Sequence, residues 1–131
     1  YFTLEGGQPN LTLFDDSANA SIQARADAAL AAGRWSFVVI TYSGNELATG
    51  ITVYVDGAAV ADTDATVGTY VAMENLTALP SLGFITGSGG VVSFFDGKMA
   101  GGPLGPFFVQ VELTAATAKR LDQLGRHALA L

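Results

Sequence analysis

The chain has 131 residues, of which 50% are hydrophobic and 14% are charged, with a net charge of -6 and no cysteine. This length and apolar content fit one domain with a buried core, which excludes a disordered chain, and the lack of cysteine excludes disulfides and thiolate metal ligands. The acidic excess argues against a nucleic-acid partner, and no apolar run approaches the roughly 20 residues that cross a bilayer.

Short runs of β-branched and aromatic residues alternate with Gly, Asp, Asn and Pro turns, which is the rhythm of an antiparallel sandwich. Asp27–Ala32 is rich in alanine but too short for an isolated helix, so we interpret it as a loop. The segment Trp35–Tyr42 is apolar on both faces, which predicts a central strand with Trp35, Val39 and Ile40 buried. The strands predicted in the first half of the chain are Tyr1–Leu4, Leu11–Phe14, Asn19–Ala24, Trp35–Tyr42, Ile51–Val55 and Ala58–Ala61.

Two Asp-Gly pairs mark tight turns in the remaining pattern. Val53 and Val55 alternate with polar neighbours and are predicted to face the core, and Asp56-Gly57 follows them as a hairpin signal because both residues tolerate positive φ. Asp62–Gly68 is polar and is predicted to be an exposed loop. Later strands are predicted at Tyr70–Met73, Leu82–Thr86, Val91–Phe95 and Phe107–Val111, with a second tight turn at Asp96-Gly97.

Only the C-terminal segment has a helical pattern, over Thr114–Leu124. Thr114 stands at the N-cap position, where its hydroxyl can accept a free N–H of the first turn. Leu121 and Leu124 are predicted to form the apolar face, and Gly125 is predicted to end the helix. The residues predicted to point away from this face are Lys119, Arg120, Asp122 and Gln123.

Several short motifs occur in a fixed order, and their segments are Gly33–Trp35, Thr41–Gly44, Val53–Gly57, Phe95–Met99 and Leu113–Ala116. In this order the chain resembles the LamG-like, concanavalin A-like lectin/glucanase superfamily over roughly residues 33–124. The resemblance implies an all-β fold, an antiparallel jelly-roll β-sandwich with one short C-terminal helix, formed by residues 1–131 as a single domain.

The chain departs from the family pattern at several places. Thr117 stands where the family usually has Glu, so no carboxylate completes the capping box. Gly101–Pro106 interrupts a region where family members run an acidic strand. Because family members are often longer, one or two further strands are expected before Tyr1 or from another segment.

The arrangement of acidic residues does not predict catalysis. Glycosidases need two facing carboxylates, and the hydrolases of this superfamily carry theirs in a Glu-x-Asp-x-x-Glu run. This chain has no such run, and its only histidine, His127, follows the helical pattern. The glutamates stand singly, at Glu5, Glu46, Glu74 and Glu112. We therefore expect a protein that is not an enzyme.

Two kinds of ligand site remain open. Trp35, Tyr42 and Tyr54 could stack on a sugar ring, although packing in the core or across strands is the simpler interpretation. Asp15-Asp16 with Asn19 nearby, or Asp62 with Asp64, could supply oxygen ligands to calcium, although solvated loop acids are the simpler interpretation. The spacing of these acids is not specific, so no metal is assigned and no other cofactor is expected.

One apolar segment, Gly101–Phe108, contains two prolines and three glycines that deny it a regular sheet ladder. Leu104, Phe107 and Phe108 are therefore a candidate partner patch, unless they fold back onto their own core. The low charge also favours burial against protein neighbours in an oligomer.

We expect a non-catalytic structural or adhesive module of an extracellular or virion surface. The candidate assemblies are a phage virion (capsid decoration or tail appendage) and a bacterial surface protein. The alternative is a carbohydrate-binding module of a secreted protein, with a glycan as its partner. Neither nucleic acid nor insertion into a membrane is expected.

Overall fold

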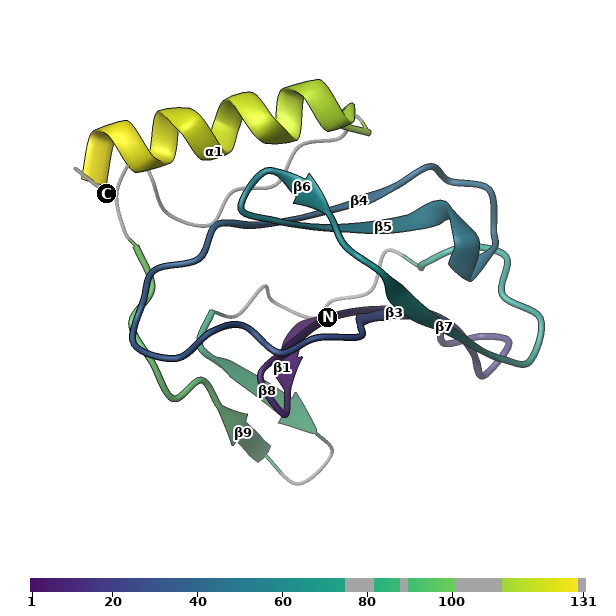
Figure 1. Ribbon diagram of the computed structural model, residues 1–131. Coiled ribbons are helices and arrows are strands. Elements are labelled where there is room, and N and C mark those ends of the chain that lie inside the picture. The colour runs from purple at the N-terminus through teal and green to yellow at the C-terminus, as the bar shows by residue number, and fades with distance from the viewer. Residues whose placement is uncertain (75–81, 88–89, 101–111, 130–131) are drawn as a thin grey trace.

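The computed structural model describes residues 1–74, 82–87, 90–100 and 112–129, and strands in these ranges pair antiparallel throughout (Figure 1). The four-stranded sheet has the order β1-β2-β3-β7, with β1 at Phe2–Glu5, β2 at Gln8–Asp15, β3 at Ala20–Ala26 and β7 at Asp62–Val67. The three-stranded sheet has the order β4-β5-β6, with β4 at Val38–Tyr42, β5 at Ile51–Val55 and β6 at Ala58–Ala59. A 3-10 turn, η1, spans Ala48–Gly50, the β8–β9 hairpin comprises Phe84–Gly87 and Gly90–Phe94, and helix α1 spans Ala115–Leu129.

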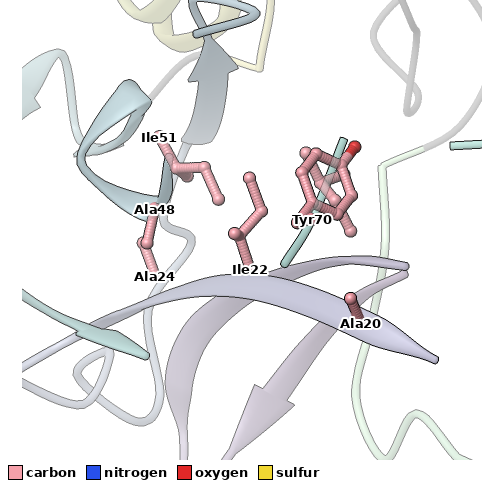
Figure 2. Packing of buried hydrophobic residues seen from close by; sticks show 7 residues of the cluster. Ala20, Ile22, Ala24, Ala48, Ile51 and Tyr70 are labelled. Carbon is pink, nitrogen blue, oxygen red and sulfur yellow. The ribbon is translucent and has the colours of Figure 1, made fainter. Parts of the chain in front are cut away.

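The alternation of side chains along β3 divides the four-stranded sheet into two faces. Ala20, Ile22, Ala24 and Ala26 are buried, whereas the residues between them are half-buried and point to the opposite face. Ala20, Ile22 and Ala24 pack against Ile51 of β5 and its neighbours, so the two sheets form a sandwich. Figure 2 shows Ile22 rising from β3 between Ile51 and Tyr70. The complete buried cluster is Leu13, Ala20, Ile22, Ala24, Ala48, Ile51 and Tyr70.

Helix α1 lies over the three-stranded sheet, on the side away from the four-stranded sheet (Figure 1). The helix contacts β6, and the turn before β6 approaches it so closely that a Cβ on Gly57 would lie 3.1 Å from the Cα of Lys119. Gly57 also has a φ of 78°, so both its conformation and this close approach favour glycine. The predicted antiparallel sandwich with a C-terminal helix is thereby confirmed.

The start of α1 is as predicted, but its end and its buried face are not. The Thr114 hydroxyl accepts the N–H of Thr117 at 3.2 Å, which confirms the N-cap. Gly125 does not end the helix, which continues to Leu129. Gly125 instead packs against the ring of Phe37, and a Cβ at residue 125 would lie 3.7 Å from that ring. The buried face contains Ala118 and Asp122, although Asp122 was predicted to point away from it, and Leu124, predicted to lie on the apolar face, is 56% exposed.

The strand predicted at Trp35–Tyr42 is shorter, because β4 begins at Val38. Trp35 is 39% exposed and is therefore not the core residue that its apolar surroundings predicted. Its neighbours explain the difference: Arg34 reaches a carboxylate near the surface, and the backbone ladder toward β5 begins only at Phe37. Of the other predicted core residues, Val53 is fully buried, and those that are half-buried are Val39, Ile40 and Val55.

Two further segments differ from the prediction. Asp62–Val67, predicted as a loop, forms the edge strand β7, because β3 satisfies its backbone while its polar side chains stay mostly exposed. Tyr70–Met73, predicted as a strand, has no strand geometry, because the N–H groups of Val71 and Ala72 bond to the carboxylate of Asp15 instead of a sheet.

The strand predicted at Phe107–Val111 lies outside the described residues. No helix in the described ranges is both long and apolar enough to span a membrane.

Replacing Ile22 with Ala should lower the free energy of unfolding by about 2–5 kcal/mol, because a fully buried side chain on a central strand leaves a cavity. Val67→Ala, at a site 60% exposed on the edge strand, is the control and should change stability by less than about 0.5 kcal/mol. Urea titrations of both variants test this, and an equal loss at the two sites would contradict the assigned core.

Candidate functional site

The outer face of the four-stranded sheet, which points away from the sandwich core, carries a bonded polar cluster. Asn10 lies at its centre and is fully buried. Its Nδ2 donates to Thr3 Oγ1 at 3.2 Å and to Glu5 Oε1 at 2.9 Å, and its Oδ1 accepts from Gln23 Nε2 at 2.8 Å. Arg25 lies beside Asn10 in the strand register and approaches Glu5 at 3.7 Å. We call this cluster the Asn10 network, and its members are Thr3, Glu5, Asn10, Gln23 and Arg25.

Two aromatic rings lie on the same outer face. Phe14 lies opposite Ser21 in the register, and Tyr1 exchanges backbone hydrogen bonds with Thr12, so both side chains point away from the core. Their ring centroids are 5.4 Å apart with an interplanar angle of 38°. Tyr1 is 52% exposed and Phe14 is 47% exposed, so this aromatic pair offers apolar surface beside the polar network.

This face combines fixed hydrogen-bonding groups with exposed rings, which is the composition that orients a polar ligand against an apolar surface. The amide of Asn10 uses its bonds to hold Thr3, Glu5 and Gln23 in place, and the outward groups of Glu5 and Arg25 remain accessible. Glu5 is the one carboxylate that the register places on this face within the described strands. Acid–base hydrolysis of a glycosidic bond would require a second one opposite.

The acids predicted as possible calcium ligands have another role at Asp15. Its Oδ1 accepts from Ser17 Oγ and Ala18 N, both at 3.0 Å, and its Oδ2 accepts from Val71 N at 3.1 Å. The carboxylate of Glu74 accepts hydrogen bonds from the N–H groups of Asp16 and Ser17, each at 2.7 Å. Asp15 and Glu74 together are called the carboxylate clamp, since they tie the β2–β3 turn to the segment after Tyr70.

Hydrogen bonds set the charge state of the clamp. The N–H of Ala18 is the main cause that lowers the pKa of Asp15, against an opposing effect of burial. The bonds from Ser17 lower the pKa of Glu74. The described residues contain no group of three or more His, Cys, Asp or Glu side chains that could hold a metal ion. At the other predicted pair, burial and then the charge of Asp64 raise the pKa of Asp62.

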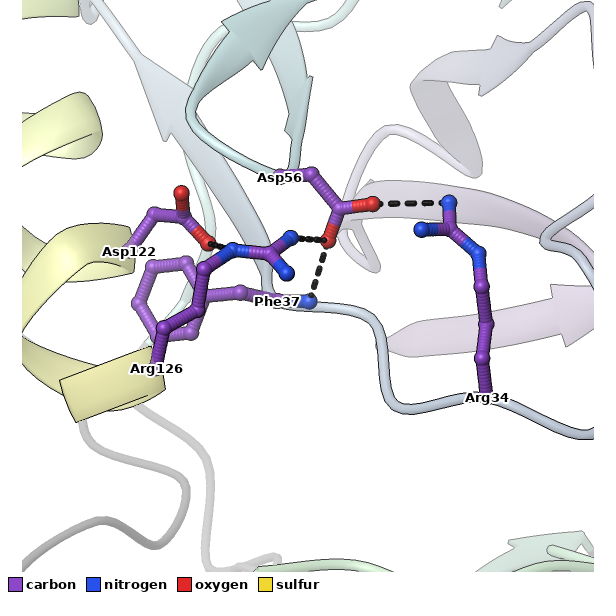
Figure 3. Close-up of polar contacts among 5 residues, drawn as sticks. All are labelled: Arg34, Phe37, Asp56, Asp122 and Arg126. Carbon is purple, nitrogen blue, oxygen red and sulfur yellow. Dashed lines mark hydrogen bonds and ion pairs between the residues drawn. The ribbon is translucent and has the colours of Figure 1, made fainter. Parts of the chain in front are cut away.

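A second carboxylate, Asp56, joins three segments at the β5–β6 turn (Figure 3). Arg34 and Arg126 approach it from opposite sides, at 2.8 Å and 2.9 Å, and the N–H of Phe37 donates to it at 3.0 Å. Arg126 also binds Asp122 of its own helix at 2.9 Å. We call these charged residues the Asp56 network, and they join the segment before β4, the β5–β6 turn and α1.

Comparison with known proteins agrees with this architecture. The family model described as the concanavalin A-like lectin/glucanases superfamily, Laminin_G_3, matches residues 1–101. The chain belongs to this superfamily. No curated protein matches it. A crystal structure of a domain from an S-layer domain-containing protein of Clostridium thermocellum is similar, with a TM-score of 0.51 and 16% identity over 92% of this chain. The chain spans 64% of that structure, and at this identity the likeness shows the fold alone.

The structure gives a physical role to two motifs of this superfamily domain. Arg34 of the Gly33–Trp35 motif and Asp56 of the Val53–Gly57 motif form one ion pair. They are therefore parts of one structural contact. The Phe95–Met99 motif has a bend at Gly97 where a tight turn was predicted.

The predicted sugar-stacking residues are dispersed. Tyr54 is buried, and Tyr42 packs against the core while its hydroxyl accepts the N–H of Glu46 at 2.8 Å, so core packing is confirmed for both. Trp35 is exposed, on the segment before β4. The predicted partner patch, Leu104, Phe107 and Phe108, lies outside the described residues and stays a prediction.

The Asn10 network and the aromatic pair were not predicted. The second strand was predicted to begin at Leu11, whereas β2 already begins at Gln8. The alternation of Asn10, Thr12 and Phe14 was the available signal, because residues two apart share one face of a strand.

Arg126→Gln should lower the free energy of unfolding by about 1–3 kcal/mol, because it leaves the nearly buried Asp122 without its cation and removes one donor from Asp56. Arg34→Gln removes a more exposed partner of the same carboxylate and should cost about 0–1 kcal/mol. Urea titrations followed by circular dichroism test the order of the two losses. A larger loss for Arg34→Gln would contradict the role given to α1.

The carboxylate clamp should make the free energy of unfolding decrease as the pH is lowered below about 4.5. The pKa values of Asp15 and Glu74 are lowered in the folded protein from ordinary values of 3.8 and 4.5, so the unfolded chain binds more protons there and acid favours unfolding. The raised pKa of Asp62 acts in the opposite sense. Melting temperatures of the wild type and Glu74→Gln between pH 3 and pH 6 isolate the clamp, and an equally steep decline in the variant would contradict it.

Proposed function

We propose that this concanavalin A-like domain is a non-catalytic adhesive module of a bacterial surface protein, with the outer face of the four-stranded sheet as its binding surface. The observation that carries the proposal is the aromatic pair beside the Asn10 network on that face. A surface whose side chains are already held by hydrogen bonds loses little conformational freedom when a ligand binds.

The cell-surface location is supported by the likeness to the S-layer domain-containing protein of Clostridium thermocellum. Composition agrees with it, since 14% of the residues are charged whereas soluble domains average about 25%. A low density of charge suits packing against neighbours in a surface assembly. A virion surface would suit the same composition, but the fold comparison favours a bacterial one.

The proposal of a non-catalytic module is supported by the acids of the described residues. Glu5 forms an ion pair with Arg25 and accepts a hydrogen bond from Asn10. Asp15 and Glu74 accept hydrogen bonds from backbone N–H groups. Asp56 forms ion pairs with two arginines. Each of these carboxylates thus has a structural partner. The protein neighbours proposed for the assembly would use the Leu104, Phe107 and Phe108 patch, which rests on the sequence.

A second, more specific candidate is a carbohydrate ligand. It is favoured by the aromatic pair, because sugar rings present C–H faces to aromatic rings while their hydroxyls need donors and acceptors such as Glu5, Gln23 and Arg25. The alternative ligand is a protein neighbour. The two differ in whether purified polysaccharide alone is bound.

Tyr1→Ala and Phe14→Ala should each weaken the binding of purified cell-wall polysaccharide about fivefold, as expected for the loss of roughly 1 kcal/mol of stacking. Affinity gel electrophoresis and calorimetry measure this. Trp35→Ala, which removes an exposed ring on the segment before β4, is the control and should leave affinity unchanged.

Retention of affinity in both ring variants would remove the outer face as the sugar site. Binding to other copies of the chain without binding to polysaccharide would favour protein neighbours as the partner. The same incubations should release no new reducing ends. Cleavage that disappears in Glu5→Gln would show a hydrolase and contradict the non-catalytic proposal.

A further inference from the structure

The chain contains two Asp-Gly pairs, Asp56-Gly57 and Asp96-Gly97, in very different surroundings. Such a pair can rearrange without an enzyme. The backbone nitrogen of glycine attacks the Cγ of the aspartic acid side chain, and one water leaves as the carboxyl hydroxyl and the amide proton, which gives a five-membered succinimide. Water then adds back at one of the two carbonyls and opens the ring to either the original aspartyl or an isoaspartyl linkage. Glycine permits the attack because it has no Cβ to obstruct the approach.

At Asp56 the structure opposes this attack. Both carboxylate oxygens accept donors, from Arg34 on one side and from Arg126 and the Phe37 N–H on the other (Figure 3). Gly57 is enclosed by α1, close to Lys119 and Asp122. Rotation of the carboxyl group toward the Gly57 nitrogen would break these contacts, so reaction there first requires local opening of the network.

At Asp96 none of these restraints is present in the part of the chain that the structure describes. Asp96 and Gly97 are both exposed and lie beyond the end of β9, outside regular secondary structure. Asp96 forms no hydrogen bond or ion pair within the described ranges. Within the described ranges no contact therefore opposes rotation of its carboxyl group toward the Gly97 nitrogen.

We propose that Asp96-Gly97 is a site of spontaneous isoaspartate formation and that the Asp56 network protects Asp56-Gly57 from the same reaction. The modification would add one methylene to the backbone just after the β8–β9 hairpin, next to the bond from the Phe95 N–H to the Gly83 carbonyl at 2.8 Å. It would also free the α-carboxyl group of Asp96, which is the group that a protein carboxyl methyltransferase can methylate.

The test is to incubate the whole chain at pH 7.4 and 37 °C and to map isoaspartate at both sites by peptide mass spectrometry. Isotope uptake from water labelled with oxygen-18 and labelling by an isoaspartyl methyltransferase are the two readouts. We expect about tenfold or more isoaspartate at residue 96 compared with residue 56, because only residue 56 must open first. In strong denaturant the two sites should react at similar rates.

Two variants sharpen the test. Asp96→Glu should abolish the signal at residue 96, since ring closure through the longer side chain is much slower. It is preferable to Gly97→Ala, because a Cβ at residue 97 would lie 2.8 Å from the ring of Phe95 and distort the loop. Arg34→Gln should raise the signal at Asp56 while the far-UV spectrum stays unchanged.

Three results would overturn the proposal. The first is equal isoaspartate at the two sites in the folded chain. The second is none at residue 96 under conditions in which the denatured chain reacts. The third is a difference between the sites that persists in denaturant, which would assign it to local sequence instead of to the fold.

Discussion

The ion pairs of Asp56 are the contact on which one side of the sandwich depends. Its donors come from two segments: Arg34 and the N–H of Phe37 lie just before β4, and Arg126 lies near the end of α1. The Asp56 side chain is only 18% exposed, so removing its donors would leave a poorly solvated charge. The positions of the helix and of the first residues of β4 are therefore set together by one carboxylate.

This anchoring determines which sheet the helix covers. The helix covers the outer side of the three-stranded sheet, and the four-stranded sheet covers its inner side through Ile22 and its neighbours (Figure 1). The inner face of the four-stranded sheet is apolar, whereas its outer face carries buried Asn10 among more exposed polar groups. The chain thus separates a charged structural network from a polar surface with low net charge.

Local signals predicted much of the fold. The Asp56-Gly57 turn has φ values of 53° and 78°, and Thr114 caps α1, because both depend on residues adjacent in the chain. Errors arose where a distant contact decided the outcome. Gly125 packs on Phe37 instead of ending the helix, and Trp35 is drawn to the surface beside Arg34, whose partner is 22 residues away. Neither contact is visible in local periodicity.

The candidate site was harder to predict than the fold, because its parts become neighbours only through strand register. Asn10 is a common turn residue, and its position between a Pro and a Leu gave no sign that it would be buried. A buried amide is costly unless its donors and acceptor are used, so burying Asn10 requires Thr3, Glu5 and Gln23 to stay in place around it. That requirement fixes the polar groups beside Tyr1 and Phe14. The same bonds that make Asn10 tolerable in the sheet therefore give the outer face the rigidity that a binding surface needs.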